Sequence, residues 1–89
     1  MKTTSTLSGR IMRLPMFDGT LPDKGPIHLV SDEGDEYLLI SETSDTPGPV
    51  EHLAAASSMD FEPYINQDMV VKGDVLGTVI WAATIFESK

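Results

Sequence analysis

The feature that most constrains the fold is a pair of short apolar runs joined by a tight polar turn. Residues 27–31 (Ile-His-Leu-Val-Ser) and 36–41 (Glu-Tyr-Leu-Leu-Ile-Ser) are both rich in side chains that favour strands. The four residues between them contain one glycine among three acids, which is the length and composition of a β-hairpin connection. The sequence therefore predicts a hairpin over residues 27–41.

Hydrophobic periodicity between Pro and Gly positions predicts the other elements. The expected strands are residues 5–14, 27–31, 36–41, 69–76 and 78–87. Between the third and fourth strands, the Ala-rich residues 50–59 favour a short helix, and Pro63 prevents the helix from continuing. Residues 15–26 and 42–49 carry several Pro and Gly residues and predict loops.

Individual residues within these elements carry structural predictions of their own. Gly9 lies where the alternation of the first strand changes face, which suits a bulge or a sharp bend. Trp81 follows the inward set of the last strand and is predicted to anchor the core, and Met59 and Met69 are predicted to fill it. His28 is predicted to be a partly buried cross-strand partner and not a metal ligand or a base.

The order strand, strand, strand, helix, strand, strand resembles that of OB-fold domains, which are five-stranded Greek-key barrels. The resemblance rests on residues 7–11 (Leu-Ser-Gly-Arg-Ile), the 27–41 hairpin and residues 69–75 (Met-Val-Val-Lys-Gly-Asp-Val), and it covers nearly the whole chain. The predicted fold class is mainly β. It is a single small domain over residues 1–89, an OB-fold-like barrel with one short helix between strands three and four. A barrel of SH3 type is the alternative.

Length and composition exclude several classes of protein. A chain of 89 residues suffices for one modest hydrophobic core. Because it has no cysteine, there is no disulfide framework and no thiol chemistry, and a reducing, cytoplasmic location is expected. No run approaches the roughly 20 apolar residues that span a bilayer, so no membrane partner is expected. With no Gly-rich phosphate loop and no catalytic triad, we expect no cofactor and no enzymatic activity.

The charge is concentrated in one part of the chain. The formal net charge is −8, from 14 acidic and 6 basic residues. Residues 32–68 contain ten of these acids and no Lys or Arg. Such a segment repels a phosphate backbone, so the expected partner is a protein with a basic surface, and nucleic acid is not expected. A more specific version of this prediction is an inhibitor whose acidic side chains mimic the phosphates of DNA. The alternative is that the acidic segment only keeps the protein soluble.

The OB-fold resemblance also implies where a ligand binds. In that fold, strands two and three and the loops after strands one and four form the ligand face. Here this face comprises residues 27–41, residues 15–26, which include Lys24, and the turn at residues 76–77. The candidate binding residues are Asp32, Glu33, Asp35, Glu36, Phe17 and Tyr37. Single-stranded nucleic acid or a small ligand on this face is the alternative function. The acids lack the spacing of a calcium loop, so no metal is expected.

A local resemblance points to catalysis. Residues 58–71 resemble the Ser-Met-x-Pro segment of self-cleaving repressors and signal peptidases. The resemblance implies Ser58 as the nucleophile and Lys72 or Lys89 as its base. Two extra residues separate the Met and Pro of the motif, and a glutamine replaces its usual glycine. The prediction therefore remains a non-catalytic interaction module, with a truncated Ser/Lys peptidase-like domain as a further alternative.

Overall fold

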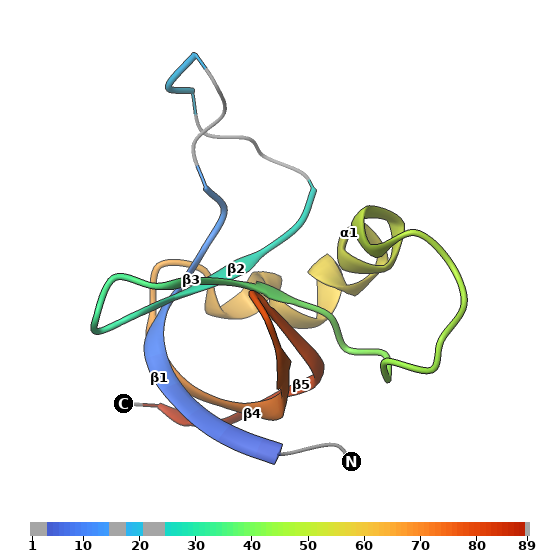
Figure 1. Cartoon of the computed structure of the whole chain (residues 1–89). Coiled ribbons are helices and arrows are strands. Elements are labelled where there is room, and N and C mark those ends of the chain that lie inside the picture. The colour runs from blue at the N-terminus through green and yellow to red at the C-terminus, as the bar shows by residue number, and fades with distance from the viewer. Residues whose placement is uncertain (1–3, 15–17, 21–24, 89) are drawn as a thin grey trace.

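The computed structural model describes residues 4–14, 18–20 and 25–88, and within them the elements follow the predicted order (Figure 1). They are β1 (Thr4–Met12), β2 (His28–Ser31), β3 (Glu36–Leu39), α1 (Val50–Phe61), the 3-10 turn η1 (Glu62–Tyr64), β4 (Asp68–Leu76) and β5 (Val79–Ser88). The predicted fold class is confirmed: the protein is mainly β, with one short helix between the third and fourth strands.

The five strands form one closed barrel in the order β1-β2-β3-β5-β4. β1 pairs with β2 on one side and with β4 on the other, and Figure 1 shows it curving around the ring. Neighbouring strands are antiparallel except β3 and β5, which are parallel.

Gly9 lies where β1 pairs with β2 and β4 at the same residue. The predicted bulge at Gly9 is not present, because both pairings run through it without a shift in register. A Cβ atom at this position would lie 2.2 Å from the backbone oxygen of Val30. Glycine is therefore required here by the close approach of two strands.

The predicted position of Trp81 in the core is wrong, because β5 contains a bulge. Ala82 has a φ of 51°, and two residues of β5 lie between Trp81 and Thr84 where one residue of β4 lies between their partners. Ile80 and Ala83 consequently both point into the barrel, at 1% and 3% exposure, while Trp81 is half-buried outside the core. The regular alternation of inward-facing and outward-facing side chains along β5 ends at this bulge.

The core fills the barrel and extends to α1. Phe61, the last residue of α1, is 2% exposed and belongs to this cluster. The other members are Ile11, Ile27, Leu29, Leu39, Met69, Val71, Ile80 and Ala83. The prediction that Met69 fills the core is therefore confirmed, whereas that for Met59 is wrong, since Met59 is 73% exposed on α1.

A buried serine attaches α1 to the chain that follows β3. Ser57 Oγ accepts a hydrogen bond from the Ser41 backbone N–H at 2.9 Å and donates one to the Leu53 carbonyl at 2.8 Å. The Ser41 hydroxyl also donates to Ser57 Oγ at 3.1 Å. These bonds satisfy a polar group that is only 2% exposed, so the helix is held against the end of β3.

We predict that Gly9→Ala destabilises the domain by about 1–3 kcal/mol or more, because the added methyl group must displace the Val30 backbone. Urea denaturation followed by circular dichroism measures the loss. The matched control is Thr6→Ala on the exposed side of β1, for which we expect a change of roughly 0.5 kcal/mol or less. Equal unfolding midpoints for Gly9→Ala and the wild type would contradict the close approach.

A second prediction compares two aromatic residues. Phe61→Ala is expected to cost about 3–5 kcal/mol, because it opens a cavity at the end of the core. Trp81→Ala is expected to cost about 1–2 kcal/mol, because the larger Trp81 side chain is only partly removed from water. Urea unfolding of both variants tests this order, and a Phe61→Ala chain that is already unfolded in buffer counts as the larger loss. A greater loss for Trp81→Ala would refute the bulged register of β5.

Candidate functional site

The candidate site is built on the hairpin between β2 and β3. Its turn is closed by hydrogen bonds from the Ser31 N–H to the Asp35 carbonyl at 2.8 Å and from the Gly34 N–H to the Ser31 carbonyl at 2.9 Å. Gly34 has a φ of 93°, a conformation that glycine adopts without strain. Ser31 Oγ accepts further bonds from the N–H groups of Glu33 and Asp35. The predicted hairpin is confirmed, and its hydrogen-bonded turn carries acidic side chains.

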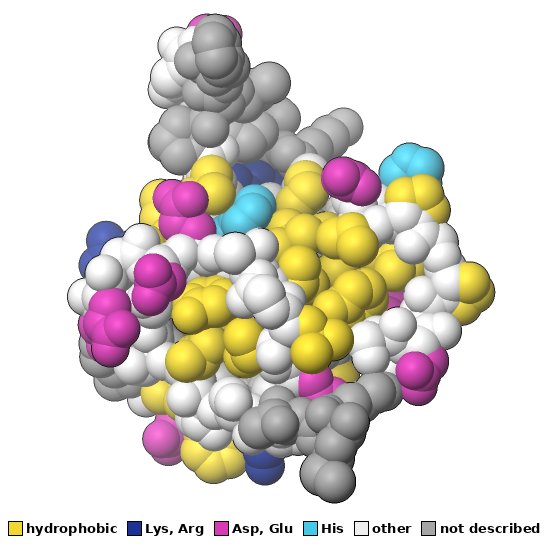
Figure 2. All heavy atoms as spheres, viewed as in Figure 1, with side chains coloured by type: hydrophobic (Ala, Val, Ile, Leu, Met, Phe, Trp, Pro, Cys, Tyr) yellow, Lys and Arg dark blue, Asp and Glu magenta, His cyan; other side chains and the backbone are white. Residues whose placement is uncertain are grey.

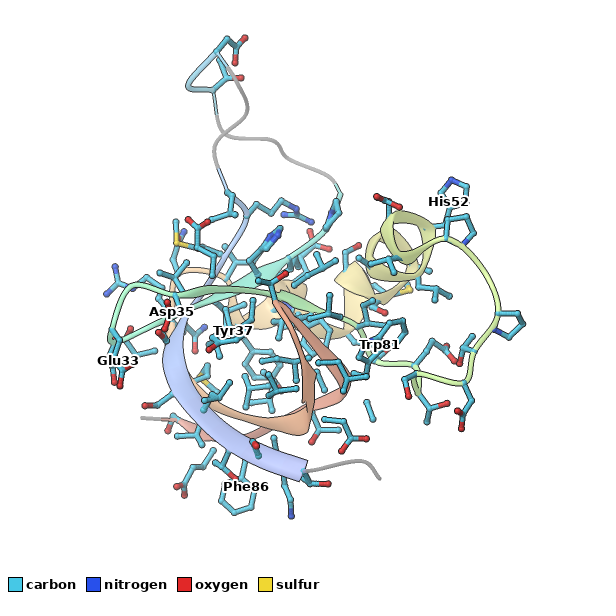
Figure 3. The ribbon with its side chains drawn as sticks, viewed as in Figure 1. Glu33, Asp35, Tyr37, His52, Trp81 and Phe86 are labelled. Carbon is cyan, nitrogen blue, oxygen red and sulfur yellow. The ribbon has the colours of Figure 1, made fainter. Side chains whose placement is uncertain are left out.

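Three of the four acids of the hairpin lie at one shallow pocket. Asp32, Glu33 and Asp35 line it together with Tyr37, and its volume is about 120 Å³. The Ser8 hydroxyl of β1 donates to Asp32 Oδ2 at 3.1 Å, which joins the turn to the barrel. Tyr37 is half-buried and packs against the core. Figure 3 shows Glu33 and Asp35 at the end of the hairpin and Tyr37 nearer the centre of the barrel.

The fourth acid, Glu36, faces a different pocket. Because side chains alternate along a strand, Glu36 and Leu38 of β3 lie on the face opposite Asp35 and Tyr37. With His28 of β2 they line an open pocket of about 410 Å³, which we name the His28 pocket. Its full lining is Leu14, His28, Glu36, Leu38, Val50, Thr78 and Val79. The structure therefore divides the four hairpin acids between two sites.

Four separate parts of the chain form the His28 pocket. They are the end of the segment after β1, the β2–β3 hairpin, the first residue of α1 and the turn between β4 and β5. The Leu38 N–H donates to the Thr78 carbonyl at 2.8 Å, so β3 holds the β4–β5 turn in place. Of the ligand face implied by the OB-fold resemblance, only residues of the 27–41 hairpin line this pocket, while its other lining residues lie just beyond the two implied loops or on α1.

His28 is the polar residue at the base of this pocket. It pairs with Met12 of β1 and Leu38 of β3, so its prediction as a partly buried cross-strand partner is confirmed. Its Nδ1 atom is buried and has no hydrogen-bond partner within the described part of the chain. Burial lowers the pKa of His28, although the nearby Glu36 carboxylate acts in the opposite direction. The pocket is therefore lined by a partly buried histidine whose Nδ1 atom has no partner among the described residues.

The acidic segment lies on the surface along its whole length. All ten acids of residues 32–68 are exposed. They are Asp32, Glu33, Asp35, Glu36, Glu42, Asp45, Glu51, Asp60, Glu62 and Asp68. Arg10 Nε contacts Asp68 Oδ1 at 3.3 Å on the exposed surface of the barrel. Figure 2 shows a face on which hydrophobic side chains gather in the centre and acidic side chains lie around its edge.

Several residues predicted to bind or to catalyse do not lie at these two pockets. Phe17 and Lys24 lie outside the described residues, as does Lys89. Ser58 lies on α1, and its hydroxyl donates to the Ala55 carbonyl at 2.8 Å. Lys72 lies on the outside of β4, with its Nζ 5.9 Å from the centre of the Phe86 ring.

Another pocket, of about 370 Å³, lies between the C-terminal end of α1 and β5. Its lining includes Ser41, Asp60, Tyr64 and Thr84. The buried Ser57 hydroxyl near Ser41 is already satisfied by the bonds described above. Sequence analysis did not identify this pocket, because its walls come from elements that are far apart along the chain.

The described residues contain neither a cluster suited to a metal ion nor a helix suited to a membrane. Over residues 4–14, 18–20 and 25–88, no group of three or more His, Asp or Glu side chains is placed to hold a metal ion. No helix in the same ranges is long and apolar enough to cross a membrane. No protein-family model, curated protein or solved structure matches the chain.

The burial of His28 predicts a pH-dependent stability. Because the folded-state pKa is lowered, the unfolded chain binds a proton at a higher pH than the folded chain does. The contribution of neutral His28 is present above the ordinary pKa of 6.5 and is lost as the pH falls through the folded-state value. The urea midpoint of the wild type should therefore decrease between about pH 7.5 and about pH 5.5.

The His28→Gln variant should lose most of this decrease, because glutamine does not titrate. The matched control is His52→Gln, at an exposed position on α1, which should keep the wild-type dependence. If the His28→Gln variant has the same pH dependence as the wild type, the prediction is wrong.

Proposed function

We propose that this domain is a non-catalytic interaction module whose acidic hairpin face docks on a partner protein with a basic surface. The observation that carries the proposal is the arrangement of the acidic segment. Residues 32–68 carry ten exposed acids and no Lys or Arg, and four of these acids line two pockets at the β2–β3 hairpin beside half-buried apolar side chains. The cytoplasmic location expected from the cysteine-free sequence is part of the same proposal.

Electrostatics supports a basic partner. A concentrated negative potential attracts a basic surface over distances of about one Debye length, roughly 8–10 Å at physiological salt. The same potential repels the phosphate groups of a nucleic acid. Since Asp32, Glu33 and Asp35 project from one hydrogen-bonded turn, their charges act together on one side of the hairpin.

The apolar residues on this face support a protein and not a free ion as the partner. Protein interfaces combine a hydrophobic centre with a polar rim. Leu38, Val50 and Val79 line the His28 pocket at intermediate exposure, and Glu36 of the hairpin lies beside them. On the face drawn in Figure 2, hydrophobic side chains gather in the centre and acidic side chains lie around the edge. Burial of the apolar residues would provide affinity, while the acids would speed association.

The strand order supports an OB-like barrel over the SH3-like alternative and keeps ligand binding on the β2–β3 face as part of the proposal. The order β1-β2-β3-β5-β4 with closure through β1, and a helix between β3 and β4, is that expected from the OB-fold resemblance. A fold by itself does not determine the ligand. Of the two aromatics expected on this face, Tyr37 packs against the core, which makes it a poor stacking platform for a base.

Neutralising the hairpin acids tests the proposed function. The tagged wild type and the variant Asp32→Asn/Glu33→Gln/Asp35→Asn/Glu36→Gln are used to capture partners from the source cell, and retained proteins are identified by mass spectrometry. We expect a protein with a basic surface that the variant retains poorly. With that protein purified, the variant should associate about tenfold or more slowly at low salt, and high salt should reduce this difference.

The matched control changes the same net charge elsewhere, through Asp18→Asn, Asp60→Asn, Glu62→Gln and Glu87→Gln, all at exposed positions. This control should retain the partner nearly as well as the wild type does. If the two variants bind equally, or if the wild type binds a single-stranded oligonucleotide tightly at physiological salt, the proposal is wrong. Competition by duplex DNA for the captured partner would identify the DNA-mimicking form of the module.

A further inference from the structure

We propose that the His28 pocket receives an arginine side chain of the partner protein. The inference rests on the proposed function and assigns to one pocket the chemistry of the residue that it recognises. The pocket combines two features, apolar walls and the carboxylate of Glu36, within a strongly acidic part of the chain.

The walls suit the aliphatic part of a long side chain. Leu14, Leu38 and Val79 come from three different segments and face the same space, and Val50 of α1 adds a further apolar wall. Arginine and lysine bury their methylene groups against such surfaces while the charged group reaches polar partners. The pocket volume of about 410 Å³ lies in the usual range for binding pockets, roughly 300–1,000 Å³.

The polar groups suit a cation with several hydrogen-bond donors. Glu36 and His28 are diagonal neighbours across the β2–β3 pair, because His28 pairs with Leu38 and Glu36 with Val30. A guanidinium has five N–H donors in a fixed plane, so it can pair with both oxygens of the Glu36 carboxylate while its stem lies against the apolar walls and the His28 ring.

The charge of the surroundings favours the same occupant. The chain has a formal net charge of −8, and Asp32, Glu33 and Asp35 lie on the same hairpin as Glu36. An anionic side chain is repelled by Glu36, and a purely apolar side chain leaves the Glu36 carboxylate without a cation. Lysine supplies the charge, but its ammonium lacks the planar donor geometry of a guanidinium.

The test uses the full chain and a small probe, N-acetyl-arginine N-methylamide, in an NMR titration of the backbone amides at low salt. We expect saturable shifts that centre on His28, Glu36, Leu38 and Thr78. The analogue N-acetyl-citrulline N-methylamide has nearly the same shape without the charge, and it should bind about tenfold more weakly. The corresponding lysine derivative should bind several-fold more weakly than the arginine probe.

Variants separate the pocket from the general negative charge. Glu36→Gln should weaken arginine binding about tenfold. The matched control Glu33→Gln removes the same charge from the same hairpin but outside the pocket, and it should change the affinity less than about twofold. Well-dispersed spectra of each variant confirm that it is folded.

Equal binding of citrulline and arginine, tighter binding of lysine, or equal effects of Glu33→Gln and Glu36→Gln would each overturn the proposal. Shifts that spread over all the acids without saturation would do the same. These outcomes are independent of partner capture. If the hairpin variant loses the partner and the wild type does not bind the arginine probe, the acidic docking surface is supported and only the assignment of the pocket is wrong. Arginine binding without a basic partner would refute the proposed function instead.

Discussion

Closure of the barrel through β1 depends on the space that Gly9 leaves for the backbone of β2. At this residue β1 pairs with Ser31 of β2 and with Met69 of β4. The Val30 carbonyl occupies the position where any other residue would place its Cβ atom. With that contact in place, β2 is held beside β1 and the ring closes. The hairpin that carries the acidic turn and His28 is thereby attached to a closed barrel and not to an open sheet edge.

Local irregularities then determine which side chains face the core and which face the surface. The bulge at Ala82 turns both Ile80 and Ala83 inward and leaves Trp81 half-buried outside the core. Ser57 binds Ser41 and holds α1 against the end of β3, which brings the first residue of the helix, Val50, to the His28 pocket. A bulge and a buried hydroxyl thus shape the surface as much as the regular strands do.

The acidic hairpin performs two different tasks in the proposed mode of binding. Asp32, Glu33 and Asp35 project from the turn and contribute to a long-range field, which acts on the rate of association and is screened by salt. Glu36 faces the opposite side of β3 and lies with His28 in an apolar pocket, where short-range geometry selects the side chain that enters. In this proposal the acids of the turn attract the basic partner, and Glu36 on the other side of the hairpin helps to select the side chain that binds.

The sequence by itself determined the number, order and type of the elements, because hydrophobic periodicity and Pro or Gly positions are local properties. It also determined the exposed acidic segment, since charged side chains are rarely buried. Only the tertiary structure decided that Trp81 lies outside the core, because a bulge changes the alternation without a clear local signal. It also decided that Glu36 separates from Asp35 and joins His28 and Val50 in one pocket. Barrel closure and the crossover through α1 bring these distant residues together, and no spacing along the chain encodes that proximity.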